Sequence, residues 1–374
     1  MMLEIQDIFK LYGDDFLKRT NPPPHVHKAV RAIQNCRTSA LGGHMDSCKE
    51  CGFVKISYNS CRNRHCPKCQ ALTKEQWVME RESDLLPVPY FHVVFTLPQE
   101  LNPFVIQNRE QLFNLLFSAS AGTLKQLAQD KKYLGAETGF ISILHTWGQN
   151  LTFHPHVHII VPGGGLTADR QWKNSRKKFF IPVKVLAKMF RGKFLDALQK
   201  IRHKIQGLED DGVWRSLANT LYAKDWYVYC KRPFKTCRSV LQYLGRYTHR
   251  VAISNHRIIS IQAGKVSFKW RDYKDGSKVK VMTLAAGEFM RRFLLHILPP
   301  GFTKIRHYGF LASAVKKTKL SLCKRLTGMK ITAKVKLSAV DLMKKITGRD
   351  IMLCPCCGIG SFSMVSGLPP PKAS

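Results

Sequence analysis

Paired cysteines near the N-terminus constrain the fold of this chain more than any other feature. Two Cys-x-x-Cys pairs, Cys48–Cys51 and Cys66–Cys69, follow one another within a short segment. A turn of this form directs two thiolates toward one ion, and two such turns complete a tetrahedral shell. A segment this small lacks a sufficient core and depends on metal to fold. The spacing predicts a structural Zn²⁺ bound by these four cysteines.

Further candidate ligands lie in the same segment. They are of the right type and number for a second, interleaved zinc site: Cys36, His44, Cys61 and His65. The alternative is that Cys36 is a buried core residue and the histidines contact phosphate. Arg62 and Arg64 lie among these positions and give the segment a positive charge that suits contact with a DNA backbone.

The charge balance indicates a polyanionic partner. The chain has 60 Lys and Arg against 25 Asp and Glu, a formal net charge of +35. Self-repulsion of this size destabilises a compact fold unless a polyanion compensates it, and nucleic acid is the usual one. An acidic membrane surface is the alternative, although the sequence has neither a long apolar span nor a secretory signal. We therefore expect a cytoplasmic, nucleoid-associated bacterial protein.

The order of predicted elements indicates an α+β fold. Strands are predicted near residues 90–97, 139–147, 156–161 and 226–231, helices near 103–130, 183–206 and 236–248, and short strands between 257 and 283. Because strands and helices do not alternate regularly, an antiparallel sheet is favoured over a doubly wound one. We expect a zinc-binding, DNA-docking domain at 1–82, a central domain at 83–300 and a basic region at 301–374.

The C-terminal region carries its own cysteines. Cys354 and Cys357, in the sequence CPCCG, look like half of a zinc knuckle. No second pair follows them, so an independent site is not expected there. The last residues, SGLPPPKAS, are expected to be disordered.

A histidine pair is the best candidate for a second kind of metal site. In FHPHVHII, His156 and His158 are two apart on a predicted strand, so both imidazoles project from one face. Two neutral imidazoles are a plausible beginning for a divalent-metal site. The third ligand is predicted to be Gln149, whose carbonyl oxygen would leave positions open for phosphate, with His154 and His92 as alternatives.

Two tyrosines are candidate nucleophiles. Tyr243 and Tyr247 are four residues apart on a predicted helix and therefore share a face, which simple core packing would also explain. A phenolate that attacks a phosphodiester conserves the bond energy in a phosphotyrosine. Basic residues beside Tyr247 are candidates for phosphate or DNA contact: Arg246, His249 and Arg250.

Several long motifs in a fixed order now point to a family. They are TSALGGHMDSCKECG, YNSCRNRHCPKCQ, FHVVFTLP, LHTWGQNLTFHPHVHIIVPGGG, YLGRYTHRVAISNHRI and FMRRFLLHILPPGFTKIRHYGFLA. Over roughly residues 30–310 the chain resembles the two-tyrosine, HUH-type transposases of rolling-circle insertion sequences. The likeness implies an N-terminal zinc-binding domain on a nuclease domain with an antiparallel sheet of the RNA-recognition type. In it the His-x-His strand is central and the tyrosine helix packs opposite.

The resemblance also implies a mechanism. His156 and His158 would hold Mg²⁺ or Mn²⁺ while Tyr247 attacks single-stranded DNA, leaving a 5′-phosphotyrosine and a free 3′-OH. Tyr243 would then cut or accept a second strand, although some relatives keep only the tyrosine corresponding to Tyr247. Plasmid rolling-circle initiators and relaxases share this chemistry. A non-catalytic zinc-dependent DNA-binding protein and a metal-dependent hydrolase that uses water are the rivals of another class.

Overall fold

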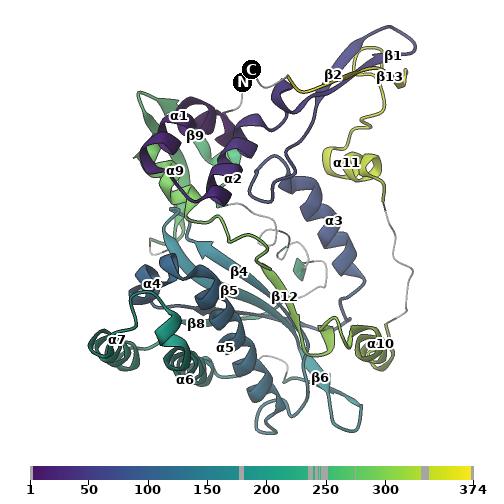
Figure 1. Ribbon diagram of the computed structural model, residues 1–374. Helices are drawn as coiled ribbons and strands as arrows, with labels where there is room; N and C mark the ends of the chain where they lie inside the picture. The colour runs from purple at the N-terminus through teal and green to yellow at the C-terminus, as the bar shows by residue number, and fades with distance from the viewer. Residues whose placement is uncertain are drawn as a thin grey trace.

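A five-stranded antiparallel sheet forms the centre of the molecule (Figure 1). The computed structural model describes residues 3–176, 181–234, 239–240, 243, 245, 252–273, 275–329 and 337–371. The strand order is β12-β4-β5-β3-β8. The bounds are β3 Tyr90–Thr96, β4 Phe140–Trp147, β5 Phe153–Pro162, β8 Val228–Phe234 and β12 Ile305–Tyr308. The predicted α+β class is confirmed, and the His-x-His strand β5 is the middle strand of this sheet.

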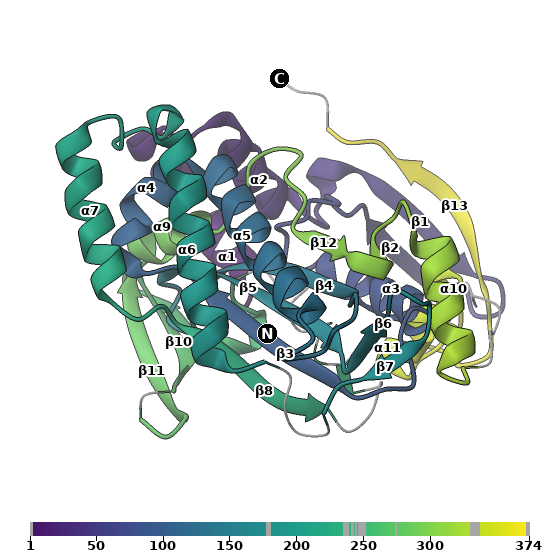
Figure 2. The ribbon, with the colours of Figure 1, turned by 90° about the horizontal axis from the view of Figure 1, so that it is seen from below.

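Helices cover one face of this sheet, as Figure 2 shows for α5 and α6. The helices here are α4 Asn102–Gln107, α5 Arg109–Gln129, α6 Val183–Ile201 and α7 Asp211–Ala223. Alternate strand residues such as Phe95 and Val157 point into this layer, where they pack with Phe117 and Phe190. The opposite alternate positions, which include the histidines of β5, therefore face away from α5 and α6.

A second core joins the N-terminus to residues far along the chain. It contains α1 Ile5–Thr20, α2 Pro24–Asn35, α9 Ala286–Leu294 and the sheet β11-β10-β9. That sheet comprises β9 Ile258–Gln262, β10 Lys265–Asp272 and β11 Lys278–Ala285. Phe9 of α1 meets Phe293 of α9 edge to face with ring centroids 5.3 Å apart. The hydrophobic core thus crosses the boundary expected between residues 82 and 83.

The last strand of the chain returns to the N-terminal segment. Strands β1 Gly43–Cys48, β2 Val54–Tyr58 and β13 Phe362–Leu368 form a sheet in the order β13-β1-β2, which we call the β ribbon (Figure 1). Leu368 pairs with Gly43 in the β1–β13 register. The expectation that the whole of SGLPPPKAS is disordered is therefore wrong, because β1 supplies an edge that binds the backbone of residues 366–368.

The remaining elements flank these layers. They are α3 Gln70–Glu82, the hairpin β6 Gly164–Leu166 and β7 Trp172–Asn174, α10 Lys316–Leu326 and α11 Ala339–Thr347. Helix α11 packs beside α3 (Figure 1). None of the helices in the described ranges is long and apolar enough to cross a membrane.

Candidate functional site

Three buried histidines converge on the sheet face that α5 and α6 leave uncovered. His145 comes from β4, and His156 and His158 come from β5. A nitrogen atom of each side chain lies within 4.8 Å of the others. The sequence pattern identified the β5 pair, and the structure adds His145 as the third member in place of the predicted Gln149.

Strand register explains why His145 completes the group. In the antiparallel β4–β5 pair, His145 lies directly opposite His156, which brings their side chains together on one face. Gln149 lies beyond the end of β4, where its side-chain amide donates to the Tyr273 hydroxyl at 3.2 Å. Strand register, and not closeness along the chain, brings His145 beside His156, while Gln149 as the third ligand stays a prediction.

Hydrogen bonds present the β5 histidines in a form suited to metal binding. Nδ1 of His156 lies 2.6 Å from the His154 carbonyl oxygen, so this nitrogen donates and Nε2 keeps its lone pair. Nε2 of His156 and Nε2 of His158 are 3.0 Å apart. Burial lowers the pKa of His156 to about 3, and burial followed by the neighbouring His145 lowers that of His158. Both imidazoles are therefore neutral at physiological pH, as ligands must be.

The donor set fits a divalent transition-metal ion. Two ligand bonds of about 2.1 Å at right angles place their nitrogen atoms about 3.0 Å apart, which matches the His156–His158 separation. Three imidazoles are softer than the oxygen ligands that Mg²⁺ prefers. The residues thus suit Mn²⁺ better than Mg²⁺.

Tyr243 reaches the same site through a fourth histidine. His92 of β3 is 3% exposed, and its Nε2 lies 2.8 Å from Nδ1 of His158. The Tyr243 hydroxyl lies 3.1 Å from Nδ1 and 3.2 Å from Nε2 of His92. One described tyrosine, His92 and the histidine cluster therefore form a continuous chain of contacts.

The segment around Tyr243 packs against α3. A Cβ atom added to Gly245 would lie 2.9 Å from a methyl group of Val78 and 3.2 Å from Cε of Lys74. Glycine is thus required here by close approach, which accounts for its place in a predicted helix. The second candidate nucleophile and its basic neighbours fall outside the described residues: Arg246, Tyr247, His249 and Arg250.

A buried lysine lies on the same side of the sheet. The Lys304 ammonium stands over the Trp147 ring at 5.1 Å from its centroid, and Trp147 stacks on His145. Burial, together with the Arg64 guanidinium, lowers the pKa of Lys304 to about 7. Lys304 lies within the motif FMRRFLLHILPPGFTKIRHYGFLA, but no ligand-like or nucleophile-like spacing there marked it as a candidate.

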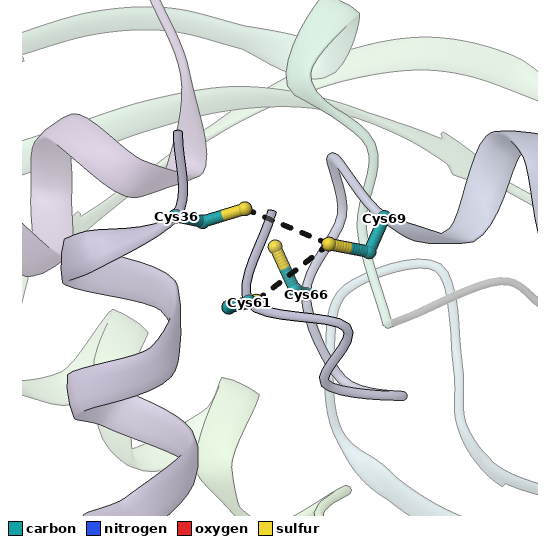
Figure 3. A group of neighbouring side chains, drawn as sticks. All are labelled: Cys36, Cys61, Cys66 and Cys69. Atoms are coloured by element: carbon teal, nitrogen blue, oxygen red, sulfur yellow. Dashed lines mark hydrogen bonds between the residues drawn. The ribbon is translucent and has the colours of Figure 1, made fainter. Parts of the chain in front are cut away.

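The cysteines form two groups of four. The inner cluster consists of Cys36, Cys61, Cys66 and Cys69, and the outer cluster consists of Cys48, Cys51, Cys354 and Cys357. Figure 3 shows the inner cluster, where Sγ of Cys69 lies 3.5 Å from Sγ of Cys36 and 3.6 Å from Sγ of Cys61. Four thiolates bound to zinc at 2.3 Å in a tetrahedron lie about 3.8 Å apart, so the inner cluster is close to the spacing of an S₄ zinc site.

The length of the β1–β2 hairpin separates the two Cys-x-x-Cys pairs. Cys48 and Cys51 lie at its tip, whereas Cys61 follows β2 at its base. At about 3.3 Å per residue, the five residues of β2 separate tip from base by roughly 16 Å. The structure therefore does not bring Cys48 and Cys51 together with Cys66 and Cys69, although the spacing predicted this, and the cysteines of CPCCG lie beside Cys48 and Cys51 instead.

The two histidines proposed as zinc ligands lie outside both clusters. His44 on β1 contacts Asp46 at 3.2 Å, and His65 lies 3.3 Å from the guanidinium of Arg64. Arg64 also donates to main-chain carbonyls, including that of Phe302 at 2.7 Å. Arg62 is exposed. Of the two arginines predicted to contact DNA, Arg64 therefore holds the 298–302 loop and Arg62 lies on the surface.

Comparisons with known proteins agree with these clusters. A family model described as "Putative transposase" matches residues 139–319, and one described as "Transposase zinc-binding domain" matches residues 8–97. "Putative transposase y4qJ" of Sinorhizobium fredii (strain NBRC 101917 / NGR234) is 44% identical over an alignment of 373 residues that covers 96% of this chain and 94% of the relative. "Transposase for insertion sequence element IS801" of Pseudomonas savastanoi pv. phaseolicola is 30% identical over 298 residues, 77% of this chain and 70% of the relative. No solved structure matches the chain.

The chain belongs to the IS91/IS801 family of transposases. The resemblance seen in the sequence motifs is thereby confirmed. In this transposase the zinc-binding match at residues 8–97 contains all of the inner cluster but only half of the outer cluster. The match at 139–319 contains the histidine cluster. Zinc is thus supported as a structural metal at the cysteines, and the histidine cluster is a second group of residues that could hold a metal ion.

Proposed function

We propose that this transposase cuts and rejoins single-stranded DNA at the ends of an insertion sequence through a 5′-phosphotyrosine. The observation that carries the proposal is the contact of the Tyr243 hydroxyl with His92, which in turn contacts His158 of the histidine cluster. A tyrosine held beside metal-binding histidines is the arrangement that nucleophilic attack on a phosphodiester needs. The family membership supports transposition as the outcome.

The hydrogen-bond network assigns a role to His92. When Nε2 of His158 serves as a ligand, its Nδ1 carries the proton and donates to Nε2 of His92. His92 then carries its own proton on Nδ1, and the Tyr243 oxygen lies close to both of its ring nitrogens, 3.1 Å from Nδ1 and 3.2 Å from Nε2. In this tautomer His92 orients the ligand His158 and stabilises negative charge on the attacking phenolate. His92 is thus a positioning residue between the metal ligand and the nucleophile.

A metal ion held by the histidine cluster and the nearby lysine would both act on the scissile phosphate. Mn²⁺ held by His145, His156 and His158 would act as a Lewis acid on a phosphate oxygen. Lys304 lies on the same side of the sheet, and in its protonated form it would add a positive charge there, although burial lowers its pKa to about 7. Both groups oppose the charge that develops on the phosphate during attack.

The covalent step balances without an external energy source. The tyrosine hydroxyl loses its proton, its oxygen bonds to phosphorus, and the bond from phosphorus to the 3′ oxygen breaks. The leaving oxygen takes up a proton and becomes a 3′-OH, while the 5′ phosphate stays on the tyrosine. Attack by another 3′-OH reverses the step and joins new strands. Tyr247, predicted from the sequence, would make the first attack, and Tyr243 would then cut or accept the second strand.

The large positive charge supports DNA as the partner. A formal +35 is suited to binding phosphate backbones with release of counterions. A rolling-circle initiator or relaxase would use the same chemistry at a replication origin or transfer locus. The matches to insertion-sequence transposases favour element ends as the substrate.

The decisive experiment is adduct formation on labelled single-stranded element ends with Mn²⁺. The expected product is a protein–DNA adduct that survives denaturing gels and maps by peptide mass spectrometry to Tyr247 or Tyr243. Tyr247→Phe is expected to abolish the first adduct, and Tyr243→Phe to cut one strand without completing transposition. Cleavage without an adduct would instead indicate a hydrolase that uses water, and binding without cleavage would indicate a DNA-binding protein.

A further inference from the structure

The outer cluster is built from two matching turns at opposite ends of the chain. Each is a Cys-x-x-Cys-Gly sequence whose glycine has a positive φ, 69° at Gly52 and 75° at Gly358. The Gly52 N–H donates to the Cys48 carbonyl at 3.1 Å, and the Gly358 N–H donates to the Cys354 carbonyl at 2.9 Å. The two turns therefore have the same knuckle form, and each directs two thiols to one side.

The four thiols of the outer cluster face one another across these turns. Sγ of Cys48 lies 3.7 Å from Sγ of Cys357, and Sγ of Cys51 lies 3.7 Å from Sγ of Cys354. These distances are too long for disulfides, whose sulfur atoms are about 2.05 Å apart. They agree with the separation of about 3.8 Å expected for two thiolates on one tetrahedral zinc ion.

Backbone donors and close packing indicate a built site. The N–H of Cys356 lies 3.4 Å from Sγ of Cys354, and the N–H of Gly360 lies 3.3 Å from Sγ of Cys357. Such donors stabilise thiolates. A Cβ atom added to Gly360 would lie only 2.3 Å from Sγ of Cys48, so the C-terminal turn approaches the N-terminal turn as closely as its backbone allows.

We propose that the outer cluster binds a second structural zinc ion, which fastens the C-terminal strand β13 to the N-terminal β ribbon. Neither family match contains both halves of this cluster, because Cys354 and Cys357 lie beyond residues 8–97 and 139–319. Zinc at this position closes the chain on itself, so that the zinc-binding domain is completed only when the C-terminus is present.

This ion has a consequence for the rest of the fold. The segment that leads to the C-terminal knuckle includes α11, which packs beside α3. Helix α3 in turn contributes Val78, whose methyl group would be the nearest atom to a Cβ added at Gly245, two residues after Tyr243. The second zinc ion therefore helps to hold α11 against α3, the helix on which the segment around Tyr243 packs.

Zinc content measured on the purified, DNA-free full chain tests the proposal. We expect two zinc ions per wild-type chain, and one in Cys51→Ser and in Cys354→Ser. Because both cysteines serve one ion, the double variant should also keep one ion, which is the ion of the inner cluster. Cys356→Ser is the matched control, because this exposed cysteine lies between the C-terminal ligands but outside the cluster, and it should keep two ions.

Each outcome decides the question. One zinc ion in the wild-type chain, two ions in the Cys51 and Cys354 double variant, or loss of an ion in Cys356→Ser would overturn the proposal. If a variant does not fold, the wild-type count and limited proteolysis decide. Removal of the outer ion with a mild chelator should expose residues 337–371 to protease while the inner ion stays bound, and protection unchanged by loss of that ion would contradict the fastening role. The assay contains no DNA, so its result is independent of the proposed phosphotyrosine chemistry.

Discussion

Replacing His92 tests the proposed link between the metal ligands and the nucleophile. In His92→Phe the new ring fills a similar buried volume but offers no acceptor to Nδ1 of His158. In the wild-type chain this atom lies 2.8 Å from Nε2 of His92. Loss of a partner that orients a metal ligand lowers metal affinity by about 10- to 100-fold, which corresponds to about 1.4–2.7 kcal/mol. We therefore expect a right-shifted Mn²⁺ dependence, with cleavage recovered at high Mn²⁺ concentration.

The assay has two readouts. Free Mn²⁺, measured by electron paramagnetic resonance, gives the binding constant directly, and adduct formation on single-stranded DNA gives the Mn²⁺ dependence of the reaction. His92→Gln retains an acceptor and should shift both curves less than His92→Phe. Circular dichroism and thermal melting establish that each variant is folded.

Two controls separate the roles of neighbouring groups. His154→Ala keeps the main-chain carbonyl that accepts from His156, and so it should leave Mn²⁺ affinity unchanged. Tyr243→Phe removes the hydroxyl on the other side of His92, and it should impair the DNA reaction without changing Mn²⁺ binding. A folded His92→Phe variant with wild-type Mn²⁺ affinity would refute the assignment of His92 as the residue that orients His158.

Further predictions follow from the same structure. His145→Ala should abolish Mn²⁺ binding and Gln149→Ala should leave it nearly unchanged in the same titration; the reverse result would restore Gln149 as the ligand. Burial lowers the pKa of His296 to about 3, so the unfolded state binds its proton first and stability falls by up to about 1.4 kcal/mol per pH unit below pH 6.5. Urea unfolding should be less acid-sensitive in His296→Gln, and equal slopes would contradict this. Gly245→Ala, which places a Cβ atom 2.9 Å from Val78, should cost about 1–3 kcal/mol of stability, measured by thermal melting, and an unchanged melting temperature would show that the contact relaxes freely. DNA affinity should fall about 10³- to 10⁵-fold between 50 and 200 mM salt if about 6–10 phosphates are contacted; a flat salt dependence would argue against backbone binding.

Three strands of the central sheet were predictable because their signals are local, whereas the edge strand β12 was not predicted. Strands β3, β4 and β5 begin and end within a few residues of the runs predicted from alternation and flanking prolines and glycines. The helix expected over residues 103–130 is instead two helices that meet at Asn108, where ψ is 50°. The amide of Asn108 donates to main-chain carbonyls of Phe104 and Gln206. Such a break depends on a partner almost a hundred residues away, which no local pattern shows.

The site was predictable only where its residues share one short motif. His156 and His158 belong to one strand, and alternation alone places them on one face. His145 and His92 come from the two strands that flank β5, opposite His156 and near His158 respectively. Pairing register decides which residues of neighbouring strands meet, and a one-residue slip would send them to the other face. A single sequence fixes alternation within a strand but not register between strands.

The cysteines illustrate the same limit over a longer range. Ribbon-like spacing predicted one zinc site for Cys48, Cys51, Cys66 and Cys69, but the structure places the two Cys-x-x-Cys pairs in different clusters. Each pair stays together because a Cys-x-x-Cys turn is a local structure. Which pairs share an ion depends on the hairpin between them, whose strands hold the two turns roughly 16 Å apart. Cys36 meets the second pair because the N–H of Arg37 donates to the Asn59 carbonyl at 3.0 Å, which holds the end of α2 at the hairpin base. At the hairpin tip, Cys48 and Cys51 meet Cys354 and Cys357, and Cys51 and Cys354 are 303 positions apart along the chain. If β1 and β2 were only about two residues long, the two Cys-x-x-Cys turns would lie close enough to share one ion, as the spacing predicted. The actual length of these strands places Cys48 and Cys51 beside the C-terminal cysteines instead.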